Sequence, residues 1–88
     1  MIQVNVQFLI IENNTCSDNA DDGISVFESS NNSINNNTCI DNRNRGIAIN
    51  YVEDTTIENN NCSNNGQNSI YSDGSINLTI TRNECIES

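Results

Sequence analysis

The charged residues that could bind a ligand or act in catalysis gather in a stretch that occurs twice in the chain. The first copy covers residues 18–22 and the second covers residues 41–45, which places them 23 residues apart. The first copy supplies three carboxylates, and the second mixes a carboxylate with two guanidinium groups. The candidate residues are Asp18, Asp21, Asp22, Asp41, Arg43 and Arg45.

Calcium is the metal that such a loop could bind, because it takes several oxygen ligands at once. Asp18, Asp21 and Asp22 offer carboxylate oxygens, but Ala20 stands where a calcium loop has a ligand, and no Glu follows at the right distance. An exposed salt bridge between Asp22 and Arg45 explains the charges equally simply. We therefore expect no metal or cofactor and keep calcium as a weak alternative.

Catalysis by acid and base groups needs two carboxylates held near a substrate, one of them in an apolar setting that raises its pKa. Every acidic residue of this chain lies in a polar stretch typical of turns, and the sequence has neither His nor Lys. The sequence therefore predicts no catalytic residue and no enzymatic activity.

Sugar binding needs less, namely amide and carboxylate groups on an open surface and an aromatic ring for stacking. We expect Tyr71 to point outward from a strand, with Phe27 and Tyr51 just beyond it. The predicted polysaccharide face consists of Phe27, Tyr51, Tyr71, Asp41, Arg43 and Arg45.

The four cysteines share the same spacing of 23 residues, which argues against a zinc site because a column of thiols cannot surround one ion. Free cysteine is often buried as a small apolar residue. We expect stacked, buried thiols, with disulfides between neighbours as the alternative. The column is Cys16, Cys39, Cys62 and Cys85.

Isoleucine and asparagine repeat at that spacing too, which is typical of one structural unit stacked on copies of itself. The isoleucine column is Ile11, Ile34, Ile57 and Ile80, and the asparagine column is Asn14, Asn37, Asn60 and Asn83. We divide this single domain into a partial coil 1–10, full coils 11–33, 34–56 and 57–79, and a partial coil 80–88.

The composition of the unit favours strands and turns, because Asn, Ser, Thr, Ile and Val are poor helix formers. Residues 24–26 and 47–49 alternate in a strand-like way. We predict an all-β parallel β-helix of about three and a half coils, with three short strands per coil and no significant helix. The asparagine column should form a hydrogen-bonded ladder at a corner in left-handed conformation, and Gly23 and Gly46 should occupy a crowded corner.

The segment Ile34-Asn35-Asn36-Asn37-Thr38-Cys39, followed by Asn42 and Gly46-Ile47-Ala48-Ile49, resembles the right-handed parallel β-helix repeats of the pectin-lyase-like superfamily. In particular, it looks like the NosD-like and surface-protein repeats. The resemblance implies an extracellular or cell-surface location. It allows a non-catalytic spacer or polysaccharide-binding module, a fragment of a polysaccharide lyase or hydrolase, or a NosD-like periplasmic factor for copper-site maturation.

A net charge of −9 argues against nucleic acid and anionic membranes as partners. No apolar stretch is long enough to span a membrane, and residues 1–10 lack the features of a signal peptide. Open end coils expose strand edges. We therefore expect these 88 residues to be part of a longer solenoid, or to cover their ends by end-to-end self-association. The leading function is a structural or polysaccharide-contacting module.

Overall fold

The computed structural model describes residues 1–4 and 7–85, with only the backbone of residues 3 and 4. These residues form eight short strands and no helix. The strands are β1 (Ile2–Val4), β2 (Ile10–Glu12), β3 (Ile24–Phe27), β4 (Ser33–Asn35), β5 (Ile47–Asn50), β6 (Glu53–Glu58), β7 (Ile70–Asp73) and β8 (Ile76–Thr81).

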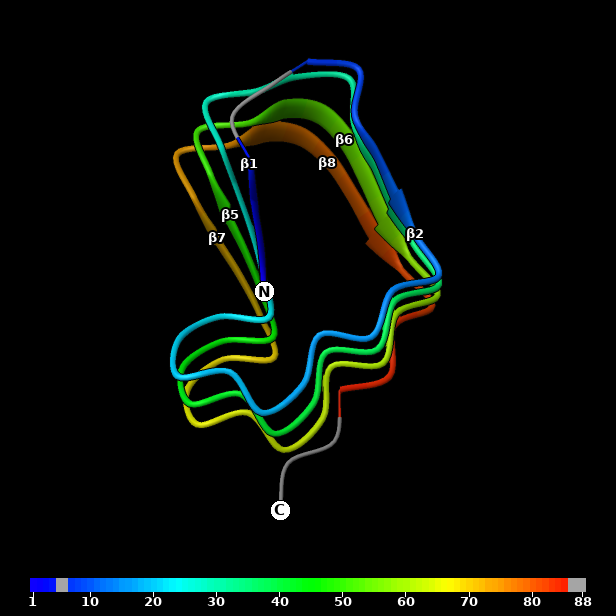
Figure 1. Cartoon of the computed structure of the whole chain (residues 1–88). Coiled ribbons are helices and arrows are strands. Elements are labelled where there is room, and N and C mark those ends of the chain that lie inside the picture. Colours follow the sequence, from blue (N-terminus) through cyan, green and yellow to red (C-terminus); the bar gives the residue numbers. More distant parts are fainter. Residues whose placement is uncertain (5–6, 86–88) are drawn as a thin grey trace.

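The strands form two parallel sheets that face each other across the core of a solenoid (Figure 1). One sheet has the order β1-β3-β5-β7 and the other has the order β2-β4-β6-β8, so the chain visits the two sheets alternately. Ile24 pairs with Ile47, which pairs with Ile70, one coil apart each time. The 23-residue period of the sequence is therefore the length of one coil, and the predicted parallel β-helix is confirmed.

The third side of each coil is not a full strand in the described residues. A column of isolated parallel bridges runs through Thr15, Thr38, Asn61 and Glu84. The Cys39 N–H donates to the Asn61 carbonyl at 2.7 Å. Three short strands per coil were expected, but this side has only one bridged residue per coil. The chain enters a left-handed conformation soon afterwards, at Asp18, Asp41 and Asn64.

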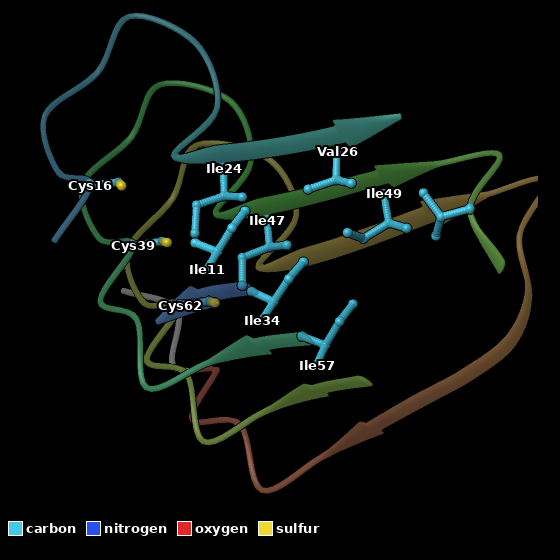
Figure 2. Close-up of a cluster of buried hydrophobic side chains, with 11 residues drawn as sticks. Ile11, Cys16, Ile24, Val26, Ile34, Cys39, Ile47, Ile49, Ile57 and Cys62 are labelled. Atoms are coloured by element: carbon cyan, nitrogen blue, oxygen red, sulfur yellow. The ribbon is translucent and has the colours of Figure 1, made fainter. Parts of the chain in front are cut away.

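The core lies between the two sheets and consists of stacked isoleucine, valine and cysteine side chains (Figure 2). Ile34 and Ile57 are fully buried, as are Ile24 and Ile47 on the opposite sheet. Burying one such side chain contributes roughly 2 kcal/mol. The period-2 alternation of the strands therefore aims apolar columns inward from both sheets, and β3 and β5 supply two of them, one through Ile24 and Ile47 and one through Val26 and Ile49.

Gly23 occupies the crowded corner that the sequence predicts. A Cβ at this position would lie 2.7 Å from the Gly46 carbonyl oxygen and 2.8 Å from the Asn42 amide nitrogen. Gly46 is equally confined, because a Cβ there would lie 2.5 Å from the Ser69 carbonyl oxygen. Neighbouring coils approach closely here because the glycines carry no side chain.

The left-handed corner lies one residue before the position that the sequence predicts. Asn13, Asn36 and Asn59 have φ values of 60°, 57° and 58°. Asn tolerates this conformation better than most residues. The asparagine that forms the ladder follows directly after, so one asparagine makes the turn and its neighbour makes the hydrogen bonds.

Candidate functional site

The predicted asparagine ladder runs through all four coils. The Asn37 amide Nδ2 donates to Asn60 Oδ1 at 3.0 Å, and the Asn37 backbone N–H donates to the same oxygen at 2.9 Å. Its second amide hydrogen goes to the Ile11 carbonyl at 3.0 Å. Asn14 and Asn83 continue the ladder at either side. Each buried amide is thereby satisfied, and each one joins three consecutive coils.

A second ladder consists of Asn19, Asn42 and Asn65, which are also spaced by 23 residues. The Asn19 amide Nδ2 donates to Asn42 Oδ1 at 2.8 Å, and the Asn42 amide Nδ2 donates to Asn65 Oδ1 at 3.0 Å. Asn42 also donates to the Cys16 carbonyl. The signal was the unbroken column of Asn at the repeat spacing, which here borders the charged loop.

The cysteines form the predicted stack of free thiols. Cys16, Cys39 and Cys62 are buried, whereas Cys85 is exposed, and none of the four is in a disulfide. The hydrogen bond with Cys62 and burial both raise the pKa of the Cys39 thiol. Burial also raises the pKa of Cys16 and Cys85. Cys16 and Cys39 are therefore neutral thiols, and the three buried cysteines pack as small apolar groups.

The acidic residues of the charged loop differ in their exposure and in their hydrogen-bond partners. Asp18 and Asp41 are exposed and make left-handed corners, with φ values of 58° and 57°. Asp21 accepts a hydrogen bond from the Asn44 amide. Among residues 1–4 and 7–85 there is no cluster of three or more His, Cys, Asp or Glu side chains suited to a metal ion. The three calcium candidates are thus not gathered into one site.

Asp22 meets Arg45 as predicted, but through the main chain. Asp22 is only 8% exposed, and its Oδ1 accepts the Arg45 backbone N–H at 3.0 Å. The guanidinium group of Arg45 lies instead over the ring of Tyr71, with Cζ 4.0 Å from the ring centroid. The predicted surface salt bridge is therefore replaced by a main-chain hydrogen bond and a cation–π contact.

The Arg45–Tyr71 pair lies on the outer face of the β1-β3-β5-β7 sheet. Tyr71 pairs in register with Ala48, which pairs with Ser25, and this column alternates with the inward isoleucines. Ala48 is fully buried in this column, whereas Ser25 and Tyr71 are half-buried. Aligning the 23-residue repeats does not reveal this pair. The Arg45 side chain extends from the corner before β5 to the neighbouring coil, where Tyr71 occupies a different column.

The remaining aromatic candidates do not join this pair. Tyr51 is 63% exposed and lies at the corner after β5, three residues beyond Ala48. A Cβ on Gly74 would lie 2.5 Å from its ring, so the ring packs against that glycine. Tyr51 borders a shallow hollow of about 220 Å³ with Glu28 and Glu53.

The other predicted members of the face are spread around it. Phe27 ends β3, in register with Asn50, and is half-buried. Asp41 and Arg43 lie in the loop before Arg45, both exposed. The predicted polysaccharide face therefore divides into the Arg45–Tyr71 pair, the Tyr51 corner and the Asp41–Arg43 loop.

In the part of the chain that the structure describes, no helix is long and apolar enough to cross a membrane. The family model for a right-handed β-helix region matches residues 2–87, nearly the whole chain. No curated protein and no solved structure matches the chain. The match agrees with the two parallel sheets and with the resemblance to the pectin-lyase-like superfamily.

Proposed function

Since the chain belongs to the right-handed β-helix family, we propose that it is a non-catalytic repeat module of a secreted or cell-surface protein. It serves as a rigid spacer and contacts polysaccharide through the outer face of the β1-β3-β5-β7 sheet. The location outside the cell rests on the family resemblance. The fold alone does not assign a function, because members of this fold class serve many functions.

The spacer role is supported by the way in which the coils are joined. Two asparagine ladders and the parallel sheets link every described coil to the next, and the ladder amides reach across three coils. Since solenoid units contact only their neighbours, such links set the stiffness of the array. A module with this arrangement holds the groups attached to its two ends at a fixed distance and orientation.

The single observation that carries the polysaccharide contact is the Arg45–Tyr71 pair. The guanidinium group holds the Tyr71 ring from one side at 4.0 Å, which reduces the entropy that the ring loses on binding. Tyr71 remains half-exposed on an outward column of the sheet. An aromatic ring in this position stacks against the apolar face of a sugar, and its hydroxyl offers a hydrogen bond.

The test measures binding of the chain to a panel of immobilised neutral and uronic-acid polysaccharides. Tyr71→Ala should weaken binding by about fivefold or more, the equivalent of roughly 1 kcal/mol for one stacked ring. Tyr51→Ala is the matched control, because it removes the same side chain from a separate corner. If Tyr71→Ala binds as tightly as the parent, or if the parent binds no polysaccharide, the proposed contact is wrong.

The absence of catalysis is part of the proposal and has its own test. Asp21 and Asp22 already accept hydrogen bonds from Asn44 and Arg45, so neither offers a free, desolvated carboxyl. Incubation with each bound polysaccharide should release no new reducing ends and no unsaturated sugar products. Release of either product, abolished by Asp41→Ala or Arg43→Ala, would instead establish the fragment of a polysaccharide lyase or hydrolase.

A further inference from the structure

The loop of residues 64–68 contains an asparagine that is followed by a glycine. Asn65 precedes Gly66, and the chain has no other Asn-Gly pair. In such a pair the main chain readily attacks the asparagine side chain, because the glycine has no side chain to obstruct the approach. The Gly66 nitrogen bonds to Asn65 Cγ, the bond from Cγ to Nδ2 breaks, and Nδ2 leaves as ammonia with the proton that the Gly66 nitrogen has lost. Water then opens the succinimide ring to aspartate or isoaspartate.

The stacking of the coils requires both residues of this pair. Asn65 belongs to the second asparagine ladder, where its Oδ1 accepts the Asn42 backbone N–H at 3.1 Å and the Asn42 side-chain amide at 3.0 Å. A Cβ at Gly66 would collide with the carbonyl oxygen of Arg43 in the preceding coil, so a larger residue fits only if the backbone shifts. The fold itself therefore places the most reactive dipeptide of the chain at this corner.

The folded coil holds the reacting atoms in place. Asn65 Nδ2 donates to the Cys39 carbonyl at 2.9 Å, so the side-chain amide is fixed at both its nitrogen and its oxygen. The Gly66 N–H donates to the Asn42 carbonyl at 2.9 Å, and the attacking nitrogen must first give up this bond. All of these bonds go to the preceding coil, residues 34–56, whose neighbouring coils on both sides are described.

We propose that Asn65 is a deamidation site that the folded solenoid keeps closed, and that it reacts only when coil 57–79 separates from coil 34–56. An aspartate at position 65 has no hydrogen to donate to the Cys39 carbonyl, and its carboxylate faces that oxygen. An isoaspartate also lengthens the main chain by one atom, which disturbs the register of the coil. A coil that has opened and reacted therefore does not stack again as before, and the modification is a permanent record of the opening.

The test compares deamidation of the folded chain with that of an unstructured peptide of residues 63–68. Both are kept at mildly alkaline pH, and peptide mapping by mass spectrometry follows the conversion of amide to acid at Asn65. The folded chain should react at least about tenfold more slowly than the peptide, and the chain in urea should react at the rate of the peptide. A folded chain that deamidates as fast as the peptide overturns the proposal.

Matched variants separate the bonds at Asn65 from overall stability. Asn42→Ala removes a side-chain donor to Asn65 Oδ1, whereas Asn37→Ala removes the equivalent amide of the other ladder. The two variants are compared at urea concentrations that unfold the same fraction of each. Asn42→Ala should then deamidate at Asn65 about fivefold faster than Asn37→Ala does. Equal rates overturn the proposal, because the site then opens only when the whole chain unfolds.

A direct substitution tests the effect of the product on stacking. Asn65→Asp carries the deamidated side chain from the outset and should unfold at a lower urea concentration than the parent. Asn64→Asp is the matched control, because Asn64 is exposed and has a left-handed φ of 57°, as Asp18 and Asp41 have in the same column. This control should unfold with the parent. An Asn65→Asp chain that is as stable as the control overturns the proposal, because a deamidated coil then stacks normally.

Discussion

The side-chain amide of Asn37 donates to the side-chain oxygen of Asn60, 3.0 Å away and one coil further along the chain. Both residues are almost completely buried, so neither has water as an alternative partner. Asn37→Asp turns a donor into an acceptor that faces the Asn60 oxygen and the Ile11 carbonyl. We expect the free energy of unfolding to fall by at least about 2 kcal/mol, measured by urea denaturation.

The control for this change is Asn36→Asp. Asn36 is exposed, and Asp tolerates its left-handed backbone, where φ is 57°. This variant should unfold at nearly the same urea concentration as the parent. Equal losses in the two variants would show that the added charge matters and that the ladder does not.

A charge in the isoleucine column should unfold the solenoid. Ile34 is fully buried between the two sheets, and Ile34→Asp leaves an unpaired carboxylate there. The expected cost exceeds about 4 kcal/mol, a large part of the stability of a domain of this size. Circular dichroism should show the loss of strand signal. Ser33→Asp, at the adjacent outward position of β4, should fold, and a folded Ile34→Asp chain would reverse the assignment of the faces.

Adding a methyl group at Gly46 should force two coils apart. The new Cβ would lie 2.5 Å from the Ser69 carbonyl oxygen and 3.0 Å from the Cys62 Cβ, so the backbone must shift. We expect Gly46→Ala to lower the free energy of unfolding by roughly 1–3 kcal/mol in a denaturation experiment. Ser69→Ala, in the same column but at a residue that already has a Cβ, should cost less. A neutral Gly46→Ala would mean that the coils are more loosely stacked.

The thiol column gives a pH dependence with a defined sign. The hydrogen bond with Cys62 and burial raise the pKa of Cys39 above its ordinary value of 9.0. The folded state therefore binds this proton more tightly than the unfolded state does, and its stabilising effect is lost as pH rises above about 9. Cys39→Ala should be less stable than the parent at pH 7, with a difference that narrows at higher pH. A constant difference between pH 7 and pH 10 would contradict the raised pKa.

Reaction of the thiols with a coloured disulfide reagent gives an independent reading of burial. Cys85 is exposed and should react first, whereas Cys16, Cys39 and Cys62 should react only as fast as the chain unfolds. Addition of denaturant should make all four thiols react quickly. Rapid reaction of all four thiols in the native chain would place the column outside the core.

The columns could be predicted from the sequence because each coil repeats the same physical constraint at the same position. Ile34 stacks on Ile57, and Asn37 bonds to Asn60, so the repeat is visible as unbroken identity at a spacing of 23 residues. The ladder, the buried thiols and the two main strands follow directly from this. The location of the left-handed turn at Asn36 instead of Asn37 was missed, since both residues are Asn and tolerate that conformation.

The outer surface could not be predicted in the same way, because its residues differ from coil to coil. Asp22 and Arg45 share a column, but the sequence does not show which atoms of Arg45 contact Asp22. The Arg45 backbone N–H donates to Asp22, because the guanidinium group packs over an aromatic ring instead. That ring belongs to Tyr71, which lies in the following coil and in another column. A hydrogen bond between Asn32 and Thr55 at the far corner was missed for the same reason, since its column contains different residue types.

The most direct test of the stacked architecture is a nuclear Overhauser experiment on isoleucine methyl groups in an otherwise deuterated chain. Ile24 pairs in register with Ile47, and Ile34 pairs in register with Ile57, with all four side chains buried in one core. We predict strong methyl cross-peaks between partners 23 residues apart. Their absence, with contacts only between near neighbours in the sequence, would contradict the β-helix.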